Sequence, residues 1–153
     1  MNVLEIKITR DDSKHARVTI WINGVVVNEP HPIDLRELAR SCFESGNFYI
    51  FTCGCGDSGC ANIHEGVQVT HDLNTTWWRF RRPQSMDGFS DREEWTSKAV
   101  EHEYDFARSA YLKAITTAIT DADHSHPLDT EYSPYGFERI DLHDLAIACQ
   151  TKK

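Results

Sequence analysis

The chain has 153 residues, of which 40% are hydrophobic and 26% charged, and its formal net charge is −8. This hydrophobic content excludes an intrinsically disordered chain, and no apolar run approaches the roughly 18 residues that a membrane helix needs. The length fits a single domain, 1–153, that buries its own core without disulfides. Residues 1–10 lack the long apolar core of a signal peptide, so the sequence predicts a cytoplasmic protein without a membrane partner.

The charge is distributed unevenly along the chain. Residues 1–82 carry ten acidic and nine basic residues, whereas residues 83–153 carry fourteen acidic and seven basic residues. An acidic surface repels nucleic-acid phosphates and attracts basic molecules. The sequence therefore predicts another protein, basic in charge, as the partner and argues against direct nucleic-acid binding. The alternative is that the charge serves solubility alone.

The N-terminal segment has the features of a β-meander. Apolar and polar residues alternate over residues 3–9 and again over residues 18–22, which is typical of half-buried strands. Asn23-Gly24 then lies between two apolar runs, and this pair suits a two-residue type I′ turn because both positions need a positive φ. Three antiparallel strands are therefore expected before residue 29.

A short helix is expected after the prolines that end the third strand. Asp34 and Glu37 have the spacing of a capping box, and Ile33 and Leu38 have the spacing of a hydrophobic staple across that cap. Gly46 is the expected end of the helix.

Residues 66–83 have the pattern of a β-hairpin with its turn at 72–75. Trp78 and Phe80 share one face of the second strand. The opposite face carries one aromatic residue and two arginines: Trp77, Arg79 and Arg81. Tryptophan and arginine are enriched at protein interfaces, so this ridge is a predicted partner-binding surface. Stacking on single-stranded nucleic acid is the alternative, which the acidic net charge disfavours.

A capping box at Ser90 and Glu93 begins a predicted long helix that ends near Asp121. Apolar residues recur in it at helical spacing, among them Val100, Tyr104, Ala107, Tyr111, Ala114, Ile115, Ala118 and Ile119. Seven acids in the segment 87–106 form a predicted acidic ridge along the helix that docks a basic partner: Asp87, Asp91, Glu93, Glu94, Glu101, Glu103 and Asp105. A solvated helix face is the alternative.

Together these elements predict an α+β fold. We expect one antiparallel sheet of about six strands, made of the meander and the hairpin, with the long C-terminal helix packed on one face and two shorter helices. The second short helix follows Asp141, and Cys42 and Cys149 are expected to face the core from the two short helices.

Three cysteines and a histidine form a candidate metal site in the segment 53–64. Cys53, Cys55, Cys60 and His64 offer the ligands of a closed Cys3His zinc site, with His71 as another fourth ligand. Glycines between the cysteines permit a tight fold around an ion. A glycine-rich turn with small buried cysteines and a redox role are the alternatives.

The segment "TCGCGDSGCANIHEGVQV…WWRF" resembles small bacterial and phage proteins that carry a CxCGxxGC-type loop before a β-hairpin. The resemblance covers residues 48–82, about a quarter of the chain. It implies a loop followed by a hairpin and brings no activity with it.

A second candidate metal cluster lies in "TDADHSH", where Asp121, Asp123, His124 and His126 could ligate a catalytic divalent metal. The alternative is a set of polar residues at the end of a helix. No common hydrolase, nucleotide-binding or protease signature is present, so no catalytic residue is assigned.

The sequence thus favours a small acidic binding protein, of the inhibitor or immunity type, that docks onto a basic macromolecule such as a nucleic-acid enzyme. A zinc-stabilised interaction module and a metal-dependent hydrolase are the alternatives.

Overall fold

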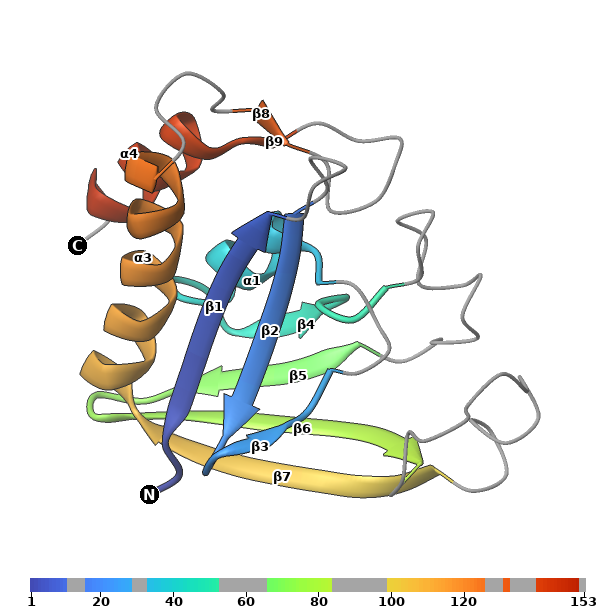
Figure 1. The fold of residues 1–153 in the computed structure, drawn as a ribbon. Helices are drawn as coiled ribbons and strands as arrows, with labels where there is room; N and C mark the ends of the chain where they lie inside the picture. Colours follow the sequence, from blue (N-terminus) through green and yellow to red (C-terminus); the bar gives the residue numbers. More distant parts are fainter. Residues whose placement is uncertain are drawn as a thin grey trace.

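The computed structural model describes residues 1–10, 16–28, 33–52, 66–83, 99–125, 131–132 and 140–151. The elements in chain order are β1 (Leu4–Arg10), β2 (Ala16–Ile22), β3 (Val25–Val26), α1 (Leu35–Arg40), β4 (Gly46–Phe48), β5 (Val67–His71), β6 (Thr75–Pro83), β7 (Ala99–Ala107), α3 (Arg108–Ser125), β8 (Glu131–Tyr132), β9 (Ile140–Asp141) and α4 (Leu142–Thr151). The predicted α+β class is confirmed (Figure 1). None of the described helices is long and apolar enough to cross a membrane.

The strands divide into separate antiparallel sheets, where the sequence suggested one. The two larger sheets have the orders β1-β2-β3 and β4-β5-β6-β7, and β8 pairs with β9. Strands of the two larger sheets run crosswise to each other in Figure 1, and α3 stands along one side of both. This helix contacts β1, β6 and β7 as well as α4. The long helix therefore packs against the sheets, as expected.

The N-terminal meander is confirmed. β1 and β2 pair in a register that places Leu4 opposite Ile22 and Ile6 opposite Ile20, so the apolar residues of both strands share one face. Asn23 and Gly24 have φ values of 53° and 79°, as a type I′ turn requires.

The capped start of α1 is also confirmed, but its end differs from the expectation. The carboxylate of Asp34 accepts hydrogen bonds from the backbone N–H groups of Arg36 and Glu37. The helix ends at Arg40, not near Gly46, which instead begins β4. The last turn closes with shorter-range backbone bonds, such as that from Cys42 to the carbonyl of Ala39, which end the α-helical pattern.

The predicted hairpin is formed by β5 and β6, with Val69 opposite Trp78 and His71 opposite Thr76. Asp72 shapes the turn, since its carboxylate accepts hydrogen bonds from the backbone N–H groups of Asn74 and Thr75.

The predicted long helix is wrong over residues 99–107, which form β7, and its expected start at 90–98 lies outside the described residues. This strand pairs with the whole length of β6, from Thr75 opposite Ala107 to Pro83 opposite Ala99. The helix begins only at Arg108. The apolar residues of this part of the chain fit two patterns. Tyr104 and Tyr111 have a helical spacing, but the alternation of acidic with aromatic residues over 101–106 also fits a strand. Pairing with β6 selects the strand.

A single cluster of buried side chains joins the sheets and helices. It includes Trp78 of β6, Phe106 of β7, and Tyr111 and Ile115 of α3, each 1% exposed or less. The short final helix contributes Cys149, which is buried as expected. This core holds β6 with one face inward and leaves its other face to solvent.

Candidate functional site

The strand β6 presents its two faces to different surroundings, as its sequence predicts. Trp78 is fully buried, whereas its neighbour Trp77 is 39% exposed. Arg79 and Arg81 are also exposed. The predicted ridge therefore lies on the outer face of the four-stranded sheet.

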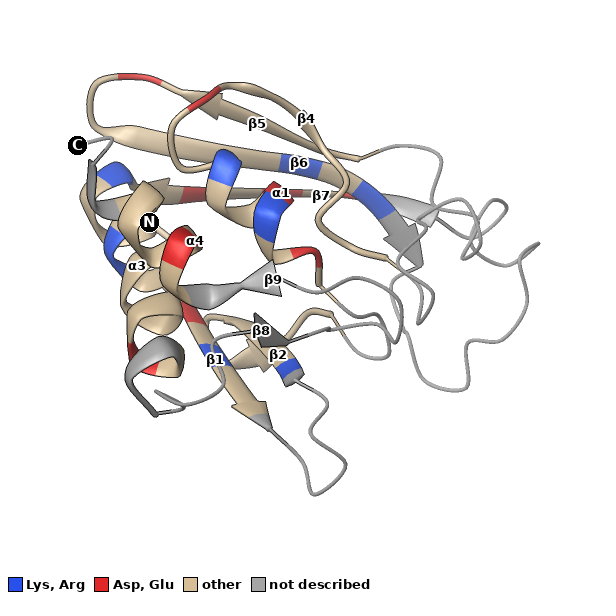
Figure 2. Cartoon of the chain, turned by 90° about the horizontal axis from the view of Figure 1, so that it is seen from above, with Lys and Arg blue, Asp and Glu red and all other residues tan. Residues whose placement is uncertain are grey.

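The structure brings the acidic ridge onto this same face, although the sequence analysis placed it on a helix. In the pairing of β6 with β7, Trp77 is opposite Asp105, Arg79 opposite Glu103 and Arg81 opposite Glu101. Figure 2 shows the basic positions of β6 beside the acidic positions of β7. The two ridges are thus one mixed-charge surface. The other predicted acidic residues, Asp87, Asp91, Glu93 and Glu94, lie outside the described residues.

Arg79 is the centre of the charges on this surface. Its Nε atom donates a hydrogen bond to Oε1 of Glu101 and lies 3.4 Å from Oε1 of Glu103. The hydrogen bond from Arg79 holds the pKa of the Glu101 carboxyl below its ordinary value, and the same bond raises the pKa of Arg79. All three side chains are well exposed, at 61%, 46% and 68% in the order Arg79, Glu101, Glu103. Because exposed ion pairs contribute little to stability, they can exchange partners readily.

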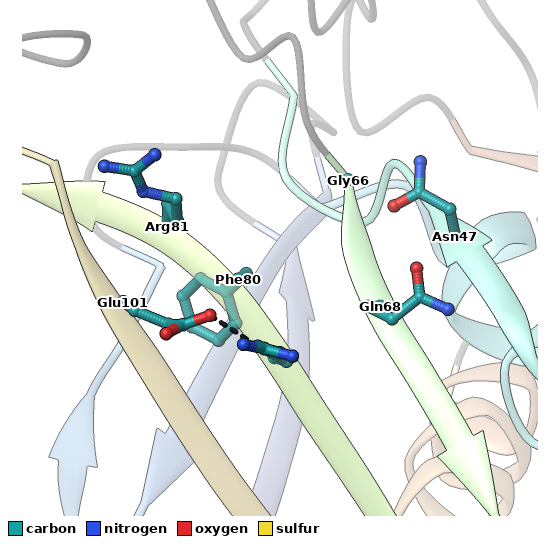
Figure 3. Close-up of a pocket in the computed structure, with 7 residues that line it drawn as sticks. Asn47, Gly66, Gln68, Phe80, Arg81 and Glu101 are labelled. Atoms are coloured by element: carbon teal, nitrogen blue, oxygen red, sulfur yellow. Dashed lines mark hydrogen bonds and ion pairs between the residues drawn. The ribbon is translucent and has the colours of Figure 1, made fainter.

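A hollow of about 370 Å³ lies at one end of this face (Figure 3). Figure 3 shows the amides of Asn47 and Gln68 on one side, with Arg81 and Glu101 on the other. The residues that line it are Asn47, Gly66, Gln68, Arg79, Phe80, Arg81 and Glu101. Amides both donate and accept hydrogen bonds, while the arginines donate and the glutamate accepts. Such a set suits peptide groups and polar side chains.

Gly66 fixes the strands beside the hollow. A Cβ atom at this position would lie 2.7 Å from the carbonyl oxygen of Phe48 and 2.9 Å from Oδ1 of Asn47. Only glycine allows β5 to begin this close to β4.

A buried hydrogen-bond chain lies on the opposite side of β6, and the sequence analysis did not foresee it. Nε1 of Trp78 donates to the hydroxyl of Tyr111 at 2.8 Å, and this hydroxyl lies 2.7 Å from Oγ of Ser41. Ser41 in turn bonds the carbonyl of Leu38. Burial raises the pKa of the Tyr111 hydroxyl, so it stays protonated and can donate to Ser41. A single sequence gives no sign that Ser41 will pair with Tyr111 or that Tyr111 will pair with Trp78.

His71 extends this chain to the hairpin. Its Nε2 atom donates to the backbone carbonyl of Ser41 at 2.7 Å, and its Nδ1 atom lies 2.8 Å from Oγ1 of Thr76. Both ring nitrogens are engaged within the protein. The alternative of His71 as a fourth zinc ligand therefore does not fit this arrangement.

The predicted zinc ligands Cys53, Cys55, Cys60 and His64 lie outside the described residues. Among the residues that the structure describes, no three histidine, cysteine or acidic side chains are grouped to hold a metal.

The candidate hydrolase cluster is only partly described. Asp121 is exposed on α3, the helix also includes positions 123 and 124, and His126 lies outside the described residues. The hydrolase stays a prediction.

The two remaining cysteines are buried. Cys42 and Cys149 are 4% and 1% exposed. Burial raises the pKa of the Cys42 thiol, which keeps it protonated and a poor nucleophile. Both behave as small apolar residues of the core, as predicted.

Comparisons with models of protein families, with curated proteins and with solved structures give no match to this chain. The resemblance of residues 48–82 to proteins with a CxCGxxGC-type loop stays a prediction. The site is therefore interpreted from its geometry alone.

Proposed function

We propose that this protein is a small acidic binding protein that docks onto another, basic protein through the outer face of β4–β7. The observation that carries the proposal is the exposed Trp77, which lies between Thr70 of β5 and Asp105 of β7. Aromatic residues and arginines provide much of the binding energy at protein interfaces. Here Trp77 supplies an apolar anchor, and Arg79 with Glu101 and Glu103 supplies the polar surroundings.

The charge of the chain supports a basic partner. The net charge is −8, and β7 adds three acids to the face. Acidic residues accelerate association with a basic protein through long-range attraction. An inhibitor or immunity-type role, in which the face covers the basic nucleic-acid site of an enzyme, fits this chemistry. Arg79 reduces the local excess of negative charge and gives the face a pattern of both signs, which favours one orientation of the partner.

The test begins with a photoreactive amino acid at position 77, which should cross-link one basic protein in the source cells. The same amino acid at position 117, on the exposed side of α3, is the control. With that partner purified, Trp77→Ala should weaken binding about thirtyfold, as expected for an interface anchor.

Leu73→Ala is the matched control, since Leu73 is 86% exposed but lies in the hairpin turn. Binding should also slow as salt increases. Equal binding by both variants, or association that is indifferent to salt, contradicts the proposal.

A zinc-stabilised loop is the second candidate. We propose it because the strands that come before and after the loop are paired. The two ends of the connection that contains this loop are paired, because Phe48 at the end of β4 is opposite Val67 at the start of β5. Ends that are already close reduce the entropy cost of gathering ligands from one short loop. The protein should then carry one zinc, and chelation should lower its Tm. A zinc-free protein whose Tm is unchanged by added zinc would contradict this.

A further inference from the structure

The outermost strand of the four-stranded sheet is β7, a nine-residue strand that pairs with β6 on one side (Figure 1). An edge strand presents a row of backbone N–H and C=O groups that a further strand can pair with. Such strand addition is a recurring mode of peptide recognition, in which backbone bonds give affinity and alternate side chains give specificity.

Two hydrogen bonds establish which residues of β7 point their backbone outward. Arg108, just after the strand, donates its N–H to the carbonyl of Asn74 at 2.8 Å, so even-numbered positions pair with β6. Asp105 faces the other way, since its carbonyl accepts the N–H of Asn2 at 2.8 Å. The backbone groups of Glu101 and Glu103 therefore point away from β6, toward the side of β7 on which no other described strand pairs.

The side chains beside this edge specify what a further strand should look like. Glu101 and Glu103 are exposed on the outer face, whereas His102 and Tyr104 are half-buried on the core side. His102 stacks on Phe80 with ring centroids 5.5 Å apart. A strand added here would place alternate residues beside two carboxylates and the intervening ones beside aromatic rings. Opposite charges across neighbouring strands stabilise the pair.

The same charges disfavour a second copy of this chain as the occupant. An antiparallel β7–β7 pair centred on Glu103 would place Glu103 opposite itself and Glu101 opposite Asp105. Like charges directly opposite each other destabilise a strand pair. The occupant that fits the edge is thus a segment of a different, basic protein.

We propose that the edge of β7 binds an extended segment of the partner in which basic residues alternate with apolar ones. The added strand accepts and donates backbone hydrogen bonds at Glu101 and Glu103, and its basic side chains lie beside these two carboxylates. This inference rests on the proposed binding function and adds the form of the partner's segment. The strand would continue the outer face that carries Trp77 and Arg79.

The probe is a ten-residue peptide of alternating lysine and valine, acetylated and amidated at its ends. Two control peptides accompany it: one with every second backbone nitrogen methylated, and one with glutamate in place of lysine. Binding is measured by fluorescence anisotropy, and protection of the Glu101 and Glu103 amides is measured by hydrogen exchange in NMR. Both amides should become protected, and both control peptides should bind at least tenfold more weakly.

Two substitutions at position 103 separate the contribution of the backbone N–H to peptide binding from that of the side-chain charge. Glu103→Pro removes an outward N–H without removing a bond to β6, which an edge strand tolerates. Glu103→Gln keeps the N–H and removes the charge. Glu103→Pro should weaken peptide binding about tenfold and Glu103→Gln about threefold, with Tm checked for both.

Four results would overturn the inference. The peptide could fail to bind, which would make the acidic edge a protection against aggregation, or it could bind Glu103→Pro as well as the wild type. The two amides could be protected in the free monomer, or protected only when the protein self-associates. If one of these results is found but Trp77→Ala still weakens binding of the partner, the proposed function stands and only the strand addition is wrong. If the photoreactive amino acid at position 77 cross-links no partner, the proposed function itself is wrong.

Discussion

Trp78 and Arg79 are neighbours on β6, yet their side chains enter two polar clusters with opposite properties. The indole of Trp78 donates to Tyr111 in a buried chain that continues to Ser41. The guanidinium of Arg79 pairs with Glu101 and Glu103 in solvent. The first cluster joins β6 to α3 and α1, whereas the second joins only β6 to β7.

The protein is fixed at the first of these clusters and can adapt at the second. A buried hydrogen bond is expensive to leave unmade, because its partner keeps the desolvation cost. The Trp78–Tyr111–Ser41 chain therefore holds the hairpin and two helices in one arrangement. Exposed ion pairs gain little and lose little when they re-form with another molecule. The outer face can thus exchange its pairs during docking without disturbing the core.

The largest expected effect comes from comparing the two adjacent tryptophans. Trp78→Ala removes a fully buried side chain and should lower the free energy of unfolding by about 3–5 kcal/mol. Trp77→Ala should lower it by less than about 1 kcal/mol, since Trp77 lies on the surface. Urea unfolding followed by circular dichroism measures both. Similar losses in the two variants would break the distinction between the faces.

Tyr111→Phe removes one oxygen from the buried hydrogen-bond chain. It leaves Nε1 of Trp78 and Oγ of Ser41 with one partner fewer, which should cost about 1–3 kcal/mol of unfolding free energy. Tyr49→Phe is the matched control, because Tyr49 is 39% exposed, and its change should stay within about 0.5 kcal/mol. Equal stability of both variants would show that the chain contributes nothing.

Alkaline pH should affect the buried side selectively. Burial raises the pKa of Cys42 and Tyr111 from their ordinary values of 9.0 and 10.0. A group with a raised folded pKa stabilises the fold below its unfolded pKa, and this contribution is lost as the pH rises above that value. Each group should therefore lower the free energy of unfolding by about 1.4 kcal/mol for every pH unit above its unfolded pKa. Cys42→Ala should make the slope of unfolding free energy against pH shallower by about half a proton at pH 9 and about nine-tenths of a proton at pH 10.

The smallest effect is expected at the exposed cluster. Arg79→Ala should raise the pKa of the Glu101 carboxyl toward its ordinary value, because the bond from Arg79 is the main cause of the lowering. A depressed pKa stabilises the fold above the unfolded pKa, and this contribution is lost as the pH falls through the folded pKa. Stability near neutral pH should stay close to that of the wild type, because exposed ion pairs contribute little. NMR titration of the side-chain carboxyl carbon of Glu101 measures the shift.

The sequence alone determined the elements whose signals are local. The positive φ values at Asn23 and Gly24, the cap at Asp34 and the two faces of the hairpin around Trp78 all follow from neighbouring residues. The residues of the predicted Trp77 ridge also lie where the alternation of β6 places them. These features need no knowledge of distant contacts, because turn geometry, capping and strand alternation act within a few residues.

Tertiary structure alone decided the conformation of residues 99–107 and the shape of the site. Glu101 and Glu103 lie on a strand because β7 pairs with β6. The paired residues are as many as 32 positions apart in the sequence, as in the pair Thr75 and Ala107. Helical and strand periods overlap in this segment, so local sequence could not select between them. The same long-range pairing set the acids opposite Arg79 and Arg81, and packing of α3 brought Tyr111 to Trp78 and Ser41. Contacts between residues far apart in the chain decided each of these, because such pairings depend on how the whole chain packs.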